Sequence, residues 1–269
     1  MENSITYIGK SISYSINGIE SNKTLVFIHG YLEYKELWSN FTKYFEENYR
    51  ILCIDLPGHG ASENLSEIHK MKEMARLVHF VINNNAINDY VLIGHSMGGY
   101  VSLAFLNLFP KETKGMVLFS SSALNDSTEK LLARNRDVEM IKNGDKNMLI
   151  DNNIPNMFAS INLVKHTKEI ENIKKHASIM NDKSIIAALN GMKTRVNNAN
   201  FLKNIDIQVL FIAGKLDNLI QIDVSERQAK GVKNISFKTL NNSGHMGYIE
   251  EAELSTTYIN NYLKDIFKN

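Results

Sequence analysis

Short apolar runs and helical segments alternate along the first 120 residues. Four runs are apolar and bounded by turn formers, a pattern typical of strands buried in a parallel sheet, and they lie at 24–28, 50–55, 90–93 and 114–120. A segment of helical character follows each of the first three, at 36–47, 68–83 and 100–109. Strands and helices in this order predict βαβ units and a mostly parallel sheet.

The two ends of the chain extend this pattern. Residues 5–16 alternate apolar and polar side chains around Gly9, which predicts a half-exposed antiparallel hairpin. Two more apolar strands are expected at 207–213 and 235–240, and an amphipathic helix at 250–267.

The middle of the chain breaks the alternation. No convincing buried strand occurs between 127 and 200, and helices are expected instead at 127–142, 146–150, 158–181 and 182–197. Ser127 and Asn181 are typical first residues of helices. We therefore expect an α/β core formed by residues 1–124 and 201–269, with residues 125–200 inserted as a helical cap over the sheet.

Composition narrows the classes of partner. The net charge is only +1, so no global field directs the chain to nucleic acid or to an anionic membrane. No apolar stretch approaches the roughly 20 residues that span a bilayer, and residues 1–10 lack the pattern of a secretory signal, so we expect a cytoplasmic protein with no integral membrane association. The eight histidines show no metal-ligand spacing, and neither a metal nor another cofactor is expected. The oligomeric state cannot be predicted.

The candidate chemistry centres on Gly94-His95-Ser96-Met97-Gly98, between a predicted strand and a predicted helix. A serine flanked by glycines two residues away on each side is the nucleophile-elbow pattern. The turn strains the serine backbone, and larger side chains at the flanking positions would collide with the neighbouring strand and helix. Ser96 is therefore the candidate nucleophile.

A nucleophilic serine needs a base, and the base needs a group that orients it. Asp217 and His245 each follow one of the last two predicted strands, so the carboxyl ends of a parallel sheet would bring them to Ser96. The chain order Ser96, Asp217, His245 is the order expected of such a site. Asp126, which follows an earlier strand, is an alternative acid.

The chain resembles the α/β-hydrolase fold superfamily over nearly its whole length. The matching segments are His29-Gly30, Asp55-Leu-Pro-Gly-His-Gly-Ala-Ser62, Gly94-His-Ser-Met-Gly-Gly99, Gly214-Lys-Leu-Asp217 and Ser243-Gly-His245. The resemblance implies about eight mostly parallel strands, with the cap inserted after the sixth. It also implies that the backbone N–H groups of Tyr31 and Met97 form an oxyanion hole. Neighbouring residues are assigned to the substrate pocket: His29, Gly30, Leu32, His95, Tyr100, Leu124 and Met246.

These features predict a serine hydrolase that cleaves a small or medium carboxylic ester. A lid with apolar faces favours an apolar acyl group. Menaquinone-pathway lyases that eliminate pyruvate resemble the chain as well, but they usually have an arginine where Tyr100 stands. Haloperoxidases or perhydrolases without a cofactor, monoacylglycerol lipases and lactonases use the same machinery, and a ligand receptor with slow turnover is the non-enzyme alternative. A carboxylate-rich substrate requires the cap arginines Arg134, Arg136 and Arg195 to face the pocket.

Overall fold

The strands form one sheet in the computed structural model, which describes residues 2–268. They are β1 Glu2–Tyr7, β2 Lys10–Gly18, β3 Lys23–Ile28, β4 Arg50–Ile54, β5 Asp89–His95, β6 Gly115–Phe119, β7 Gln208–Gly214 and β8 Ile235–Leu240. Their order is β1-β2-β4-β3-β5-β6-β7-β8. Pairs β1–β2 and β2–β4 are antiparallel and the other pairs are parallel. The predicted α/β class and mostly parallel eight-stranded sheet are confirmed.

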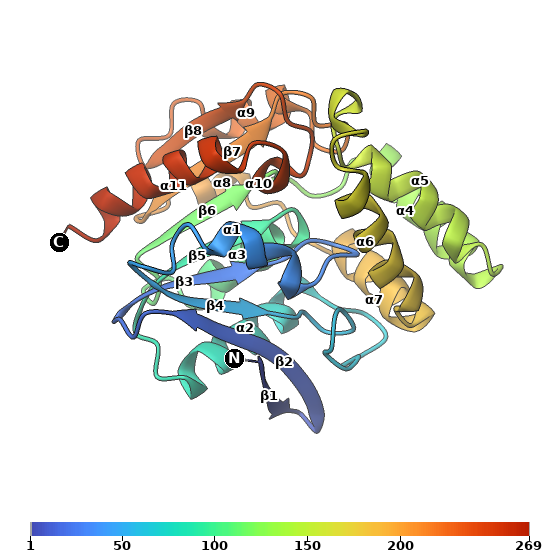
Figure 1. Cartoon of the computed structure of the whole chain (residues 1–269), viewed down its shortest axis with the longest axis horizontal. Coiled ribbons are helices and arrows are strands. Elements are labelled where there is room, and N and C mark those ends of the chain that lie inside the picture. The colour runs from blue at the N-terminus through green and yellow to red at the C-terminus, as the bar shows by residue number, and fades with distance from the viewer. Residues whose placement is uncertain (1, 269) are drawn as a thin grey trace.

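Helices cover both faces of the sheet and gather at one end of it. They are η1 Lys35–Trp38, α1 Ser39–Thr42, α2 Met71–Asn84, α3 Met97–Leu108, α4 Thr128–Lys142, α5 Lys146–Asn156, η2 Ser160–Asn162, α6 Thr167–Ile179, α7 Asp182–Lys193, α8 Ala199–Lys203, α9 Ile222–Ala229, α10 Gly247–Glu250 and α11 Ala252–Ile266. Figure 1 shows α11 on the near side of the sheet, α2 and α3 behind it, and α4 to α7 grouped beyond the ends of the central strands. The chain between β6 and β7 forms helices and contains no strand.

The core lies between the sheet and its helices. The central strand β5 is buried from Tyr90 to His95, as a strand covered on both faces must be. Phe27 of β3 packs against Trp38, Phe41 and Phe45, with ring centroids 5.1 to 6.4 Å apart. Trp38 is therefore a core residue.

The helical segment predicted at 36–47 is only partly helical. The segment forms only the short helices η1 and α1, followed by turns. At its start the Lys35 backbone N–H donates to Asp55 Oδ1 at 2.7 Å and the Lys35 ammonium donates to Oδ2 at 2.9 Å. These bonds fix the segment to the end of β4, and the aromatic packing on Phe27 then determines its path.

The helix predicted at 250–267 is confirmed as α11, which begins two residues later than predicted because the chain breaks at Glu251. Its carboxylate accepts hydrogen bonds from the Asn242 backbone N–H at 2.8 Å and from the Ser243 hydroxyl at 2.7 Å. The break between α10 and α11 thus holds the loop that follows β8. Helix α6 also begins later than predicted, because residues 157–159 bond to this same region of the core. The short helices α8 and α9 were not predicted.

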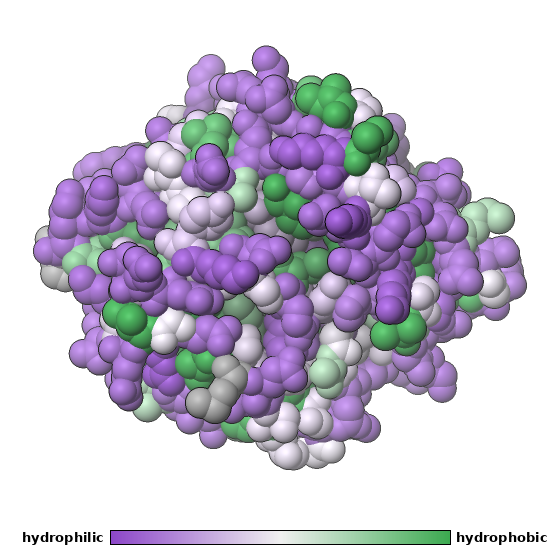
Figure 2. All heavy atoms as spheres, in the orientation of Figure 1, coloured by the Kyte–Doolittle hydropathy of each residue, from purple (hydrophilic) through white to green (hydrophobic). Residues whose placement is uncertain are grey.

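Two predicted helix starts are confirmed. The Ser127 hydroxyl accepts from the Lys130 N–H at 3.3 Å, and Asn181 Oδ1 accepts from the Lys183 N–H at 2.9 Å. Within residues 2–268 no helix is long and apolar enough to cross a membrane. The face drawn in Figure 2 is mostly hydrophilic, with hydrophobic residues in small scattered groups.

Candidate active site

Ser96 sits at the sharp turn between β5 and α3. Its backbone has φ +50° and ψ −114°, a conformation that is strained for any residue other than glycine. A Cβ on Gly98 would lie 2.1 Å from the Ile28 carbonyl oxygen, and a Cβ on Gly94 would lie 2.5 Å from the Gly98 carbonyl oxygen. The close approach of β3, β5 and α3 therefore requires both glycines, as the elbow pattern indicates.

The elbow is held by hydrogen bonds on both sides of Ser96. The Ser96 N–H donates to the Phe119 carbonyl at 3.0 Å, and the Ser96 carbonyl accepts from the Ser121 hydroxyl at 2.8 Å. Met97 begins α3, so its N–H belongs to the unpaired donors of a helix N-terminus. Leu32, in the loop after β3, is also strained, with φ +62°. Such strain is concentrated at functional sites.

Asp217 and His245 form a buried pair. His245 Nδ1 donates to Asp217 Oδ2 at 2.8 Å, and both side chains are only 1% exposed. Asp217 Oδ1 accepts from the backbone N–H groups of Leu219 and Ile220 at 2.8 and 3.0 Å. These three bonds fix the carboxylate and place the Nδ1 proton of His245 toward it, which leaves Nε2 to accept a proton.

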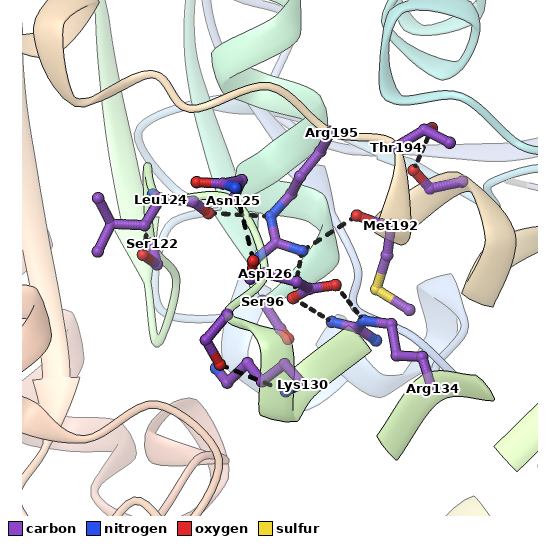
Figure 3. A network of polar contacts seen from close by, with 12 residues as sticks. Ser96, Ser122, Leu124, Asn125, Asp126, Lys130, Arg134, Met192, Thr194 and Arg195 are labelled. Carbon is purple, nitrogen blue, oxygen red and sulfur yellow. Dashed lines mark hydrogen bonds and ion pairs between the residues drawn. The ribbon is translucent and has the colours of Figure 1, made fainter. Parts of the chain in front are cut away.

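Asp126, the alternative acid, is engaged elsewhere. It binds the guanidinium groups of Arg134 and Arg195, each with a shortest separation of 2.6 Å, and Figure 3 shows it between the two. These ion pairs hold the pKa of Asp126 below its usual value, although burial acts in the opposite direction. The carboxylate at His245 is therefore Asp217.

Sequence reasoning missed a second buried acid, Glu33. His95 Nδ1 lies 2.9 Å from Glu33 Oε1 and 3.0 Å from Oε2, and both side chains are fully buried. His95 Nε2 lies 3.0 Å from the backbone carbonyl oxygen of His245. Both ring nitrogens thus face acceptors, which requires a doubly protonated imidazolium. Glu33 Oε2 also accepts from the Gly30 N–H at 2.8 Å.

The Glu33–His95 pair is ionised. Burial raises the pKa of Glu33, but the charge of His95 and its hydrogen bonds bring that pKa below its usual value. Burial lowers the pKa of His95, but Glu33 brings it above its usual value. One ion pair therefore joins the loop after β3, the elbow and the loop of His245. Only the position of Glu33, three residues after Gly30, hints at this in the sequence.

One cavity of about 340 Å³ brings Ser96 and His245 together. It is lined in addition by Tyr31, Leu32, Tyr100, Lys130, Ala133, Arg134, Arg136, Asp137, Asn153, Met157, Met192, Leu219 and Ile220. One side of this cavity is apolar, and the side from α4 is charged. The lid was expected to be apolar, and for α4 this is wrong because its residues at the cavity are mostly ionisable.

Only two of the seven residues predicted to line the substrate pocket do so. Leu32 and Tyr100 line the cavity, whereas five others do not: His29, Gly30, His95, Leu124 and Met246. These five residues are instead buried or engaged in hydrogen bonds with the backbone or with other side chains. His29 Nδ1 donates to the Gly30 carbonyl and its Nε2 accepts from the Leu56 N–H, while burial lowers its pKa to about 4. The Leu124 carbonyl accepts from Arg195 Nε at 3.0 Å (Figure 3), and Met246 is fully buried.

The three arginines expected to face a carboxylate-rich substrate also differ in position. Arg134 and Arg136 line the cavity, as a carboxylate-rich substrate requires. Arg195 does not, and its guanidinium instead lies 4.1 Å from the ring centroid of Tyr100. Among residues 2–268, no group of three or more His, Cys, Asp or Glu side chains is arranged to hold a metal ion.

A mostly parallel sheet with a strained serine after β5, and an Asp–His pair after β7 and β8, is the arrangement of an α/β-hydrolase fold protein. The sequence profile of that family, described as alpha/beta hydrolase fold, matches residues 23–252. The chain therefore belongs to the α/β-hydrolase fold family.

Individual relatives are distant in sequence. Mouse (Mus musculus) monoacylglycerol lipase ABHD6 is 22% identical over 94% of this chain and 79% of its own length. A malate-bound esterase from Thermogutta terrifontis has 23% identity and a TM-score of 0.90, with 99% of each chain covered. MenH from S. aureus also has 23% identity, with a TM-score of 0.83 over 95% of this chain and 99% of its own. Likeness to these structures establishes the fold.

Proposed function

We propose that the protein is a serine hydrolase that cleaves a carboxylic ester through an acyl-enzyme. The observation that carries the proposal is the buried Asp217–His245 pair at the cavity that holds the strained Ser96. The esterase among the similar structures and the lipase among the relatives support the same class of reaction.

In this mechanism His245 removes the Ser96 hydroxyl proton while Oγ attacks the ester carbonyl carbon. Asp217 stabilises the imidazolium that forms, and the N–H groups of Tyr31 and Met97 stabilise the oxyanion. In comparable sites one such donor contributes about 3–4 kcal/mol to the transition state. His245 then protonates the departing alcohol, and water, deprotonated by His245, releases the acid and restores Ser96.

We also propose that residues 125–200 act as a cap that closes this cavity. Supporting contacts join the segment to the His245 loop: the His245 N–H donates to the Met157 carbonyl at 2.7 Å. Glu250 accepts from the N–H groups of Gly244 and Ala159, each at 2.9 Å. The cap thus contacts the loop that carries the proposed base.

Ester hydrolysis ranks ahead of pyruvate elimination. Tyr100 occupies the position where the lyases usually have an arginine, and the arginines that line the cavity, Arg134 and Arg136, come from α4 instead of from the helix after the elbow.

The test is Ser96→Ala, assayed on p-nitrophenyl butyrate and with a fluorophosphonate that labels active serines. We expect wild-type protein to hydrolyse the ester and take the label, and the variant to do neither while keeping its circular dichroism spectrum. Ester hydrolysis by the variant at the wild-type rate would show that another group is the nucleophile.

A further inference from the structure

Helix α4 presents ionisable side chains to the proposed active-site cavity. Lys130, Ala133, Arg134 and Asp137 are spaced three or four residues apart and therefore share one face of the helix. All four line the cavity with Ser96, and so does Arg136. Charged side chains on a helix usually face solvent, whereas these border the cavity that contains Ser96. The position of this face suggests a role in binding.

The three cations of this wall differ in how they are neutralised. Arg134 is 16% exposed and is paired with Asp126, which also binds Arg195. Lys130 and Arg136, in contrast, form no ion pair within 4.0 Å with any carboxylate among residues 2–268. Asp137 is the one carboxylate among the cavity-lining residues. Cationic charge is therefore in excess here, although the whole chain carries only +1.

Tyr31, from the loop after β3, provides an independent observation. Its hydroxyl is buried and has no hydrogen-bond partner in the described part of the chain. Buried hydroxyl groups are nearly always paired, because an unpaired one loses its bonds to water without replacement. Tyr31 lines the same cavity as Lys130 and Arg136, so a polar atom of a bound molecule could accept its proton there.

The remaining wall is apolar, with Met157, Met192, Leu219 and Ile220. A ligand that fits both walls has an apolar stem and one anionic end. Because Arg and Lys recognise carboxylates through charge-assisted hydrogen bonds, the anionic end belongs at α4.

We propose that the natural substrate is an ester that carries a free carboxylate, held by Lys130 and Arg136 while Ser96 attacks the ester carbonyl. This inference rests on the proposed ester hydrolysis and specifies its substrate class. The carboxylate can lie on the acyl side or on the alcohol side of the ester, and the test covers both.

The test compares pairs of esters that differ in charge but little in size. The acyl-side pair is p-nitrophenyl hydrogen adipate and p-nitrophenyl hexanoate, each corrected for spontaneous hydrolysis. The alcohol-side pair is 6-acetoxyhexanoate and hexyl acetate. A charged hydrogen bond is worth enough to change a rate by about tenfold or more, so we expect kcat/KM to favour the anionic member of at least one pair by that factor. The preference should shrink as salt is added.

The variants assign this preference to the two cations. Lys130→Met combined with Arg136→Met should remove the preference, so that kcat/KM falls at least tenfold more for the anionic ester than for the neutral one, mainly through a higher KM. Two single variants that keep Lys130 are also compared. Arg136→Lys should retain more of the preference than Arg136→Met, because it keeps the positive charge. Lys142→Met is the matched control, since Lys142 lies on α4 but does not line the cavity.

The outcomes separate this inference from the proposed function. Hydrolysis of the neutral esters with no preference for either anionic ester overturns the carboxylate site and leaves the esterase intact. A preference that survives the double variant also overturns the site. Absence of all ester hydrolysis, together with absence of fluorophosphonate labelling at Ser96, refutes the esterase itself.

Discussion

Replacement of Glu33 by glutamine tests whether a buried ion pair holds the active-site loops together. The substitution keeps the size of the side chain and removes the charge opposite His95. In the native protein the His95 imidazolium donates to Glu33 and to the His245 carbonyl. Without the carboxylate, His95 either stays charged in a fully buried position or releases a proton and loses one donor.

The magnitude follows from burial. Removing one partner of a buried ion pair typically costs about 3–5 kcal/mol, because the other charge is left uncompensated. His95 can escape part of this cost by deprotonation, so we expect the lower end, about 3 kcal/mol. A neutral His95 can keep its proton on Nε2 for the His245 carbonyl and accept the new amide N–H at Nδ1, but neither bond is then charge-assisted. This weaker contact should loosen the His245 loop and lower kcat more than it raises KM.

Urea denaturation and ester kinetics measure the two effects. The matched control is Glu112→Gln, which removes the carboxylate from the pair of His79 and Glu112, at 2.7 Å, where the side chains are 22% and 43% exposed. An exposed pair contributes about 0–1 kcal/mol, so the control should unfold at nearly the wild-type urea concentration. If Glu33→Gln lowered stability no more than Glu112→Gln, the ionised buried pair would be refuted.

The difference in stability between wild type and Glu33→Gln should also depend on pH. The pKa of Glu33 is lowered in the fold, so its contribution is complete above the ordinary value of 4.5 and is lost as pH falls through the folded value. The pKa of His95 is raised, so its contribution is complete below the ordinary value of 6.5 and is lost as pH rises through the folded value. The difference should therefore be largest between these two ordinary values. A difference that does not vary from acid to alkaline pH would contradict the charge assignment.

Three other substitutions test the rest of the site. Asp217→Asn should lower kcat by about 10⁴ with little loss of stability, because the amide favours the wrong tautomer of His245. Hydrolysis of p-nitrophenyl butyrate measures kcat, and urea unfolding measures stability. Near-normal turnover would exclude Asp217 as the orienting acid. Asp126→Asn should instead lower stability by about 3 kcal/mol and keep turnover within about tenfold, since it leaves two guanidinium groups that are mostly shielded from solvent without a counter-charge. A loss of turnover as large as that of Asp217→Asn would reverse the two roles. Gly98→Ala puts a Cβ 2.1 Å from the Ile28 carbonyl oxygen, so folded yield and activity should both fall. At Gly144 nothing lies within 4 Å of an added Cβ and only the φ of +90° opposes the change, so Gly144→Ala measures backbone strain without a collision.

Much of the sheet, and the strained turn that carries Ser96, could be predicted because their signals are local. The apolar run of β5 and the glycines around Ser96 lie within a dozen residues and meet a simple steric requirement. Asp217 and His245 were placed by the rule that parallel strands end at one edge of the sheet. The irregular helices could not be predicted in this way, since the break at Glu251 depends on bonds to Asn242 and Ser243 in another loop.

The groups that hold the site were missed for the same physical reason. Glu33 is meaningful only when the loop after β3, the elbow and the His245 loop are already assembled, because its partners are His95, 62 residues away, and the Gly30 N–H. Likewise, the charges of α4 form an ordinary solvated pattern until the helix is placed over Ser96. A sequence motif identifies atoms that react, because chemistry restricts their residue types. The residues that position those atoms, and those proposed to select the substrate, depend on where distant segments meet. Lys130 therefore became a candidate only in the folded chain, and the sequence could not tell which of the three cap arginines line the cavity.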